Sequence, residues 1–418
     1  MNAPAERGPV EFPPVDFAPV ELAELPPQEA VDYIIREALH RKASDIYLMS
    51  EETQLNISLR RMGSVEMLAS VPKEMGRHVL NLIKANAGMD IAERRRPADG
   101  RLIYDEGDMK VDLRINCIPT LFGEDLTCRM LDRTTKLLSL DQLGMTRSEV
   151  GQLQSILSSP SGLILVTGPT GTGKTTTLYA ALQHLNDGTR KLNTLEDPVE
   201  YAVAGIRQSQ VHAKIGVDFS ELLRNVLRQA PDVIMVGEIR DEETAITAVR
   251  AANSGHLVLA TLHAPVASGA IQSMLSLGVH PYFLASGLLG VVAQRLVRVL
   301  CRECRQEFDI SVSPATFEDI KDLLAPDQGK SIFGPGGCEK CYGMGYASRT
   351  GLFEVMTFNH EIRLLVSHSR PAKEIEQRAI QAGMLEFRRG ALLKVAQGIT
   401  STEEMLRCVP TEYLGLEE

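Results

Sequence analysis

The sequence predicts an α/β fold, in which a mostly parallel β-sheet with helices on both faces forms the central part of the chain. Between Leu138 and Leu262, short apolar runs of strand length alternate with stretches of helical spacing, which is the pattern of repeated βα units. The run Gly162–Thr167 is continuously apolar, as expected for a strand buried on both faces. A glycine-rich segment separates this run from the next helical stretch, an order that is typical of phosphate-binding loops.

The predicted strands and helices follow one another in a regular order. In the central part, the strands are Gly162–Thr167, Lys191–Glu196, Val233–Glu238 and His256–Leu262, and the helices begin at Lys174 or span Phe219–Gln229 and Glu242–Asn253. A smaller α+β domain precedes them, predicted from helices Gln28–Arg41 and Met75–Ala87 and strands Ile46–Met49, Leu55–Arg60 and Lys110–Cys117. Helical spacing returns through Ile362–Gln397, which predicts a helical subdomain near the end of the chain.

Size and charge exclude several classes of protein. A chain of 418 residues can form roughly two or three domains, each with its own core. The formal net charge of -10 provides no overall basic surface for wrapping nucleic acid. No leader of charged and then apolar residues opens the chain, and its nearest approach to a membrane span, Phe283–Val297, is interrupted by Gln294 and Arg295. We therefore expect a soluble protein whose contact with a membrane is peripheral.

The glycine-rich segment matches the pattern GxxxxGK[ST] of phosphate-binding (Walker A) loops in full. Its glycines let backbone N–H groups point inward at an anion, and the start of the following helix adds its positive dipole end. Lys174 is expected to contact the β- and γ-phosphates of ATP, and the Thr175 hydroxyl to hold Mg²⁺. The alternative is a glycine-rich turn without a ligand, which explains neither the Lys-Thr pair nor the strand–helix setting. The predicted nucleotide-binding residues are Gly168, Pro169, Thr170, Gly171, Thr172, Gly173, Lys174, Thr175 and Thr176.

Two carboxylates are predicted at the same edge of the sheet, each directly after a strand. Glu238 ends a segment in which Gly237 stands where most phosphate-loop enzymes have an Asp. Glu196 supplies the second carboxylate, after the preceding strand. Hydrolysis needs one carboxylate to order the attacking water and another near the metal, and either residue fits either task. The alternative for Glu196 is a solvated acidic loop.

A histidine is predicted at this edge as well. His263 directly follows the strand His256–Leu262. Two interpretations stay open: it senses the γ-phosphate or relays its loss to a neighbouring subunit, or it is only a hydrogen-bonded polar residue at a strand end.

Four of the seven cysteines fall into two CxxC pairs, Cys301/Cys304 and Cys338/Cys341. Four thiolates in two tight pairs are the ligand set of a tetrahedral structural zinc site, although the interval between the pairs is longer than in a usual zinc ribbon. A redox role is the alternative, and it is disfavoured because two pairs occur and neither opens a helix behind a strand. The remaining cysteines are interpreted as small buried apolar residues: Cys117, Cys128 and Cys408.

Taken together, these motifs resemble the signatures of the type II secretion and type IV pilus assembly ATPases. The segments that carry the resemblance are Gly168–Thr175, Thr194–Tyr201, Ile234–Asp241 and Gly255–His263. The tetracysteine segment is similar to that of the secretion and pilus-extension branch, whereas pilus-retraction motors generally lack it. The resemblance covers roughly Gln28 to the end of the chain.

The resemblance implies a RecA-like phosphate-loop ATPase domain, an amino-terminal α+β (PAS-like) domain, a zinc-binding insertion and a C-terminal helical subdomain. Asp99-Gly-Arg101 and Asp112-Leu-Arg114 resemble the amino-terminal domain, which sits over a neighbouring subunit's nucleotide. Arg101 and Arg114 are therefore candidate arginine fingers, and the alternative for each is a solvated surface arginine. The implied segments are a Pro-rich mobile tail (1–27), the α+β domain (28–133), the ATPase domain (134–295), the tetracysteine segment (296–358) and the helical subdomain (359–418).

The function implied by the resemblance is that of a hexameric cytoplasmic ATPase, peripherally associated with the bacterial inner membrane, that uses ATP, Mg²⁺ and Zn²⁺. Hydrolysis would power assembly of pilin or pseudopilin subunits in type IV pilus extension, a competence pseudopilus or type II secretion. The expected partner is a polytopic inner-membrane platform protein, and no nucleic acid is expected. The alternative is a RecA-like nucleic-acid motor, a helicase or DNA-packaging ATPase, but the sequence lacks the interleaved aromatic and basic residues that stack bases.

Two features depart from the family pattern. After His263 the family usually continues with Asn and Asp residues, whereas this chain has Ala264-Pro-Val-Ala267, which makes coupling of this strand end to the nucleotide less secure. Larger members carry an extra amino-terminal domain that docks on a membrane partner. Here a Pro-rich tail takes its place, which favours a smaller pilus or competence-type system.

Overall fold

The computed structural model describes residues 22–106, 109–132, 137–311, 314–326 and 328–409. The chain forms two compact units. The first comprises the residues up to Lys136 together with the short segment Gly337–Met344, and the second comprises Leu137–Gly336 and Gly345–Glu418. Each unit contains a β-sheet and a hydrophobic core of its own.

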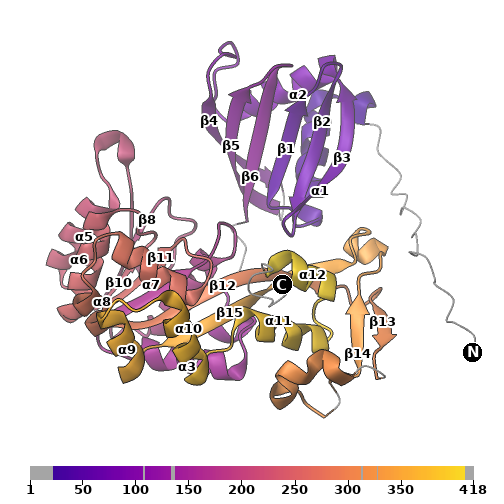
Figure 1. Cartoon of the computed structure of the whole chain (residues 1–418). Helices are drawn as coiled ribbons and strands as arrows, with labels where there is room; N and C mark the ends of the chain where they lie inside the picture. Colours follow the sequence, from indigo (N-terminus) through magenta and orange to yellow (C-terminus); the bar gives the residue numbers. More distant parts are fainter. Residues whose placement is uncertain (1–21, 107–108, 133–136, 312–313, 327, 410–418) are drawn as a thin grey trace, which may run out of the picture. The chain divides into compact units, whose positions relative to one another are not determined.

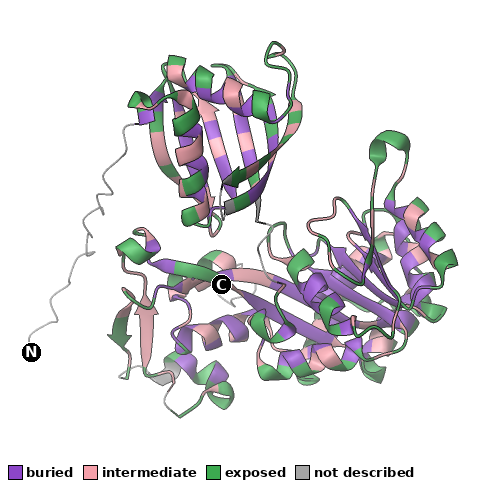
Figure 2. Cartoon of the chain, turned by 180° about the vertical axis from the view of Figure 1, so that it is seen from behind, coloured by how far each residue is buried: buried purple, intermediate pink, exposed green. Residues whose placement is uncertain are grey.

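The first unit is a six-stranded antiparallel sheet with two helices on one face (Figure 1). The strand order is β3-β2-β1-β6-β5-β4. Alternate residues of β2, such as Leu55 and Ile57, are buried because they point towards the helices, and α1 contributes Val31 and Ile35 to the same core. Figure 2 shows buried stretches along the strands of this unit. The elements are α1 (Pro27–His40), β1 (Asp45–Ser50), β2 (Gln54–Arg61), β3 (Ser64–Pro72), α2 (Lys73–Asn86), β4 (Ala98–Glu106), β5 (Met109–Pro119) and β6 (Glu124–Asp132).

The second unit contains a seven-stranded sheet of order β15-β12-β7-β11-β10-β8-β9. Its strands run parallel except for the edge strand β15, which is antiparallel to β12. The central strands are buried along their whole length, as the apolar runs predict. The strands are β7 (Gly162–Thr167), β8 (Leu192–Glu196), β9 (Arg207–Gln210), β10 (Val233–Val236), β11 (Leu257–Leu262), β12 (Leu288–Leu300) and β15 (Tyr346–Thr357).

Helices cover both faces of this sheet. Successive residues of β7 enter different cores: Leu163 and Leu165 pack with the helices of one face, and Ile164 and Val166 with those of the other. The first face carries α5 (Phe219–Val226), α6 (Glu242–Asn253), α7 (Ala267–Ser276) and α8 (Pro281–Gly287), and the second carries α3 (Arg147–Leu157) and α4 (Lys174–Leu185).

The later part of the second unit is helical, apart from a small hairpin. Strands β13 (Gln306–Asp309) and β14 (Ser331–Gly334) pair antiparallel next to the CxxC segments. Within the described residues, four helices follow β15, and α9 and α10 contact α8 and α7 (Figure 1). They are α9 (His360–Ser367), α10 (Ala372–Gln381), α11 (Phe387–Ala396) and α12 (Thr402–Cys408).

The predicted fold class is confirmed by this architecture. The predicted strands and helices between β7 and β11 lie within a few residues of their observed positions, whereas the edge strand β9 was not predicted. The apolar run Phe283–Val297 is divided between α8 and β12, and the long pair β12–β15 is not predictable from the pattern because the continuously buried stretch Gly290–Gln294 has no alternation. Among the described residues, no helix is both long enough and apolar enough to cross a membrane.

Candidate active site

The phosphate-loop sequence forms the turn between β7 and α4, at the carboxyl edge of the parallel sheet. Gly168 has a φ of +147°, and a Cβ atom there would lie 2.4 Å from the carbonyl oxygen of Gln294. A side chain at this position would therefore collide with β12, and only glycine fits. Gln294 also donates a 2.7 Å hydrogen bond from its side-chain amide to the carbonyl of Thr172, which fixes the loop against β12. The loop residues exposed at the open edge are Pro169, Thr170, Gly171, Thr175 and Thr176.

Lys174, the first residue of α4, folds back over its own loop. Its Nζ donates hydrogen bonds to the carbonyl oxygens of Gly168 (2.7 Å) and Pro169 (3.1 Å), and lies 3.5 Å from Nδ1 of His263. Burial lowers the pKa of Lys174, and the nearby carboxylate of Glu238 opposes that effect. The ammonium group is thus held by neutral carbonyls, which a phosphate oxygen can replace with a stronger, charge-assisted partner.

Glu238 and His263 meet at the carboxyl ends of β10 and β11. Nε2 of His263 lies 2.9 Å from Oε1 of Glu238, and the Arg240 guanidinium lies 2.6 Å from Oε2. Burial raises the pKa of Glu238, but Arg240, His263 and Lys174 outweigh it, so that the net shift is downward. The carboxylate is therefore ionised at neutral pH. Lys174, Glu238 and His263 form one contiguous group, and their roles stay predictions.

Glu196 lies at the end of the adjacent strand β8 in a different environment. Its side chain is buried, and it accepts hydrogen bonds from Tyr179, from Thr194 Oγ1 at 2.6 Å and from Gln208 Nε2 at 3.0 Å. Burial raises the pKa of Tyr179, and its bond to Glu196 adds to that shift, so the phenol stays protonated and keeps donating. Glu196 is consequently enclosed by donors, which is not the environment of a solvated acidic loop.

Gly237 stands between these two carboxylates because β8 approaches it closely. Its N–H donates a 2.7 Å hydrogen bond to the carbonyl of Leu195, and a Cβ atom would lie 2.9 Å from that oxygen. An Asp in the place of Gly237 would therefore push β8 and β10 apart. The close approach explains why a single carboxylate, Glu238, follows this strand.

Arg101 and Arg114, the candidate arginine fingers, lie in the first unit on neighbouring strands. They are directly opposite each other in the register of β4 and β5. Arg101 binds the buried Asp112 through two hydrogen bonds, one of them 2.8 Å between Nε and Oδ1, and this bond raises the pKa of the guanidinium. The Arg101 side chain is nevertheless 58% exposed, which leaves it accessible to a further anion. Action across a subunit interface stays a prediction.

The same register extends the two arginines into a row across the sheet. Arg129 of β6 is opposite Arg114, Asp45 of β1 is opposite Arg129, and Arg60 of β2 is opposite Asp45. Residues in register share one face of a sheet, and here that face lies away from the helices because the buried neighbours point towards them. Arg129 donates a 3.3 Å hydrogen bond to Asp45, so one carboxylate serves two arginines. Sequence reasoning misses Arg129 and Arg60, since only the strand register places them beside Arg101.

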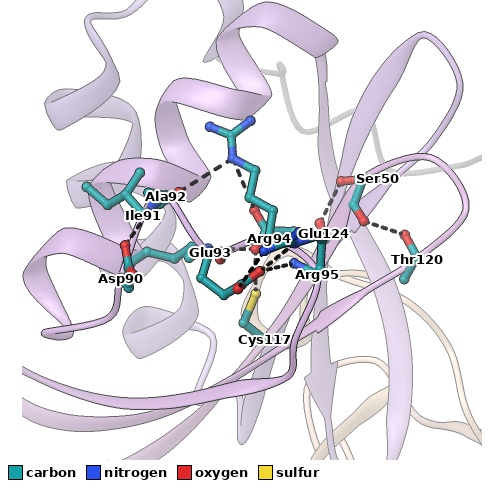
Figure 3. Close-up of polar contacts among 12 residues, drawn as sticks. Ser50, Asp90, Ile91, Ala92, Glu93, Arg94, Arg95, Cys117, Thr120 and Glu124 are labelled. Atoms are coloured by element: carbon teal, nitrogen blue, oxygen red, sulfur yellow. Dashed lines mark hydrogen bonds and ion pairs between the residues drawn. The ribbon is translucent and has the colours of Figure 1, made fainter.

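A separate polar group in the first unit surrounds Glu124, and Figure 3 shows most of it. The Glu124 carboxylate accepts a 2.6 Å bond from the buried Lys84 and a 3.3 Å bond from the Cys117 thiol, and Arg94 lies 4.0 Å away. Burial, followed by the hydrogen bond to Glu124, raises the pKa of Cys117 to about 12, so this cysteine stays a neutral thiol. These contacts compensate a buried carboxylate, and they involve none of the predicted site residues.

The two CxxC pairs come together in the structure. The four Sγ atoms of Cys301, Cys304, Cys338 and Cys341 all lie within 4.8 Å of one another, and the last two are 3.7 Å apart. Tetrahedral zinc with Zn–S bonds of about 2.3 Å holds its sulfurs roughly 3.8 Å apart, so the spacing fits the metal. Cys301 and Cys341 are buried, as the ligands of a closed structural site should be.

Two solved structures share the architecture of both units. The Legionella pneumophila ATPase DotB superposes with a TM-score of 0.70 at 20% identity, covering 93% of this chain and 96% of that one. The pilus retraction motor PilT, solved with bound ADP, gives a TM-score of 0.60 at 23% identity, covering 92% and 98%. These likenesses show the fold, an α/β unit with a glycine-rich loop between a buried strand and a helix at the carboxyl edge of its sheet, preceded by an α+β unit.

Sequence comparison specifies the family within this fold class. Residues 22–407 match the family described as "Type II/IV secretion system protein". The chain is 40% identical to the type II secretion system protein E of Dickeya dadantii over 382 residues, 91% of this chain and 75% of that protein. It is 39% identical to the type IV pilus assembly ATPase PilB of Thermus thermophilus over 379 residues, 91% of this chain and 42% of that protein. The chain belongs to the type II/IV secretion system protein family and is an ATPase.

Proposed function

We propose that this chain is the motor subunit that powers assembly of pilin or pseudopilin subunits, in type IV pilus extension, a competence pseudopilus or type II secretion. It works as a homo-hexamer in the cytoplasm, peripherally at the inner membrane, with a polytopic platform protein as partner. The relatives named type II secretion system protein E and pilus assembly ATPase PilB support this assignment. The structural observation that carries it is the contiguous group of Lys174, Glu238 and His263 beside the phosphate loop.

The residues at this edge suit ATP with Mg²⁺. Gly168 lets the loop lie directly against β12, where a Cβ atom would meet the Gln294 carbonyl oxygen, and Lys174 directs its ammonium group at the same loop. Lys174 would bind the β- and γ-phosphates, and the exposed Thr175 hydroxyl would be a ligand for Mg²⁺, which supplies charge neutralisation when bound. Glu238 would accept the proton of the attacking water, because it is ionised and partly exposed. His263 would respond to the γ-phosphate through its contacts with Lys174 and Glu238.

Replacing Lys174 with Ala tests the proposed site. We expect ATP hydrolysis to be abolished and the circular dichroism spectrum to be unchanged, because the variant loses a phosphate ligand and no core volume. Hydrolysis at near-normal rates in this variant would contradict the proposed function. The wild-type rate should rise with the cytoplasmic domain of a platform protein and not with single-stranded DNA, whereas stimulation by DNA alone would favour the nucleic-acid motor.

We further propose that the four cysteines hold one structural zinc per chain. Thiolates at this spacing bind zinc tightly enough that metal loss and local unfolding should occur together. Replacing Cys338 with Ser should release the zinc and expose Cys301–Cys341 to protease, while ATP still binds. Replacing Cys408 with Ser, outside the cluster, is the matched control and should leave the metal content at one. Metal-free protein with four free thiols and a protected segment would disprove the site.

A further inference from the structure

A buried carboxylate outside the active site joins the segment after His263 to the C-terminal helices. Glu354 lies on the edge strand β15 with 2% of its surface exposed. Its Oε2 accepts a 3.0 Å hydrogen bond from the N–H of Ala267, and its Oε1 accepts a 3.2 Å hydrogen bond from the N–H of Phe387. Ala267 is the first residue of α7 and Phe387 is the first of α11, so one side chain binds the amino ends of two helices.

The helix α7 is connected directly to the active-site edge. Residues 264–267, which lack the Asn and Asp of the family pattern, join His263 to this helix. Thr167 Oγ1 accepts a 2.8 Å bond from the N–H of Ala264 and donates a 2.9 Å bond to its carbonyl. Thr167 and Glu354 lie in one register row on either side of Ala293, so they face the same side of the sheet. The segment is thus bound at its start by Thr167 and at its end by Glu354.

A second route links the same segment to α11. The Arg295 guanidinium donates a 3.3 Å hydrogen bond to the carbonyl of Pro265, and it also lies over the Phe387 ring at 5.3 Å. Arg295 therefore touches the middle of the segment and the first residue of α11. Both routes end at Phe387.

Apolar packing accompanies these two polar routes. Val266, Ala267 and Phe387 share one hydrophobic core with Ile375 of α10. An open cavity of about 630 Å³ lies beside this core, lined by Glu354, by Pro265 and Val266, and by Lys373 and Glu376 of α10.

We propose that Glu354 is a positioning residue for ATP hydrolysis, which fixes the segment 264–267, and through it His263, relative to α11. A change at the sheet edge that carries the phosphate loop is then transmitted to the C-terminal helices through the N–H groups of Ala267 and Phe387. The proposal rests on the proposed function of His263 as the residue that responds to the γ-phosphate. In this chain the two sheet residues Thr167 and Glu354 secure the segment whose sequence departs from the family.

The substitution Glu354→Gln tests the connection, because the amide keeps the shape but offers only one acceptor oxygen to the two N–H groups. We expect kcat to fall about tenfold with KM changed less than about threefold, since Lys174 still binds phosphate. In the wild type, a non-hydrolysable ATP analogue should slow amide hydrogen exchange in peptides covering 264–270 and 385–390. In Glu354→Gln the response at 264–270 should persist and the response at 385–390 should be weakened, because only the route through Arg295 remains.

Glu149→Gln provides the matched control. Glu149 is also a buried carboxylate of the second unit that accepts a backbone N–H, from Thr146 at the start of α3, and it makes no contact with the segment 264–267. A merely structural effect would lower the melting temperature of both variants and leave the exchange response at 385–390 intact. An intact response at 385–390 in Glu354→Gln therefore overturns the proposal.

A double variant separates this proposal from the proposed function. If Glu354 acts through His263, adding Glu354→Gln to His263→Ala should change kcat less than about twofold beyond His263→Ala alone. If the double variant lowers kcat by the product of the two separate factors, Glu354 acts independently of His263 and the proposal is overturned. Normal hydrolysis in His263→Ala would instead refute the role of His263. If Glu354→Gln does not fold, Arg295→Met cuts the second route and must weaken the same exchange response, and an unchanged response would count against the proposal.

Discussion

Two glutamates end neighbouring strands of one sheet, yet they lie in opposite environments. Glu196, after β8, is buried and accepts three hydrogen bonds from neutral side chains. Glu238, after β10, is partly exposed and is surrounded by the cationic or titratable groups of Lys174, Arg240 and His263. Position at the carboxyl edge of a parallel sheet therefore does not by itself define a role. The neighbours determine whether a carboxylate is committed to the fold or available to a substrate.

The largest expected effect comes from replacing Glu238 with Gln. The amide keeps the shape and loses the charge that accepts a proton, so turnover should fall on the order of a hundredfold or more while ATP still binds. The same change at Glu196 should cost less than about tenfold in turnover, because its carboxylate is buried and already accepts three hydrogen bonds from neutral side chains. Single-turnover kinetics on both variants measure the contrast. If turnover falls only a few fold in Glu238→Gln, the general base would be assigned to Glu196 instead of Glu238.

The next effect concerns three arginines of the first unit. Arg101, Arg114 and Arg129 stand in one row, and we expect Ala at any of them to lower turnover about tenfold without preventing nucleotide binding by a single subunit. Rings that mix such a variant with Lys174→Ala subunits should regain part of the activity. In these rings some sites combine the intact Lys174 of one subunit with the intact arginine of its neighbour. Lys110→Ala, which removes an exposed cation of β5 outside the row, is the control. Assembled mixed rings that stay inactive would argue against action across an interface.

How much of this site is readable from sequence depends on how local each feature is. The phosphate loop is local, because its residues are consecutive and its glycines are required by positive φ angles of the backbone. The enclosure of Glu196 is not local, since Tyr179 and Gln208 come from α4 and β9. The arginine row likewise requires the register of antiparallel strands, which alternation alone does not specify. The parallel sheet is predictable from its apolar runs, whereas side-chain partners depend on how distant segments meet in the folded chain.

Tyr179→Phe measures the enclosure of Glu196 directly. Removing the phenol oxygen leaves the buried carboxylate with one donor fewer, which should lower the free energy of unfolding by about 1–3 kcal/mol. Turnover should change less than about threefold, because Glu238 is untouched. Urea unfolding together with steady-state kinetics gives both quantities, and Tyr201→Phe, whose ring packs edge-on against Tyr179, is the matched control. A fall in turnover larger than the loss of unfolding free energy can explain would indicate that Glu196 takes part in ATP hydrolysis.

A third glutamate, the buried Glu354, extends the comparison through a change of melting temperature with pH, which is the smallest effect expected. Burial raises its pKa from an ordinary 4.5 to about 7, and Glu376 and Glu386 add to the shift despite the opposing bonds from Ala267 and Phe387. The other charged groups facing it are Lys373 of α10, Arg388 of α11 and Arg295 of β12.

The raised pKa sets the sign of the pH dependence. Because the folded state binds this proton more tightly than the unfolded chain, the stability that Glu354 contributes is complete below about pH 4.5 and is lost as the pH rises towards 7. The melting temperature of the wild type relative to Glu354→Gln should therefore fall between pH 5 and pH 7, by roughly 2–4 °C per pH unit at most. Glu404→Gln is the control of opposite sign: burial opposes ionisation, but Arg407 and Arg298 hold the pKa of Glu404 at about 2. That carboxylate loses its stabilisation only as the pH falls from about 4.5 towards 2, so the difference between wild type and Glu404→Gln should be flat between pH 5 and pH 7. A flat difference for Glu354→Gln as well would mean that Glu354 is already ionised at pH 5, held like Glu238 by the groups around it.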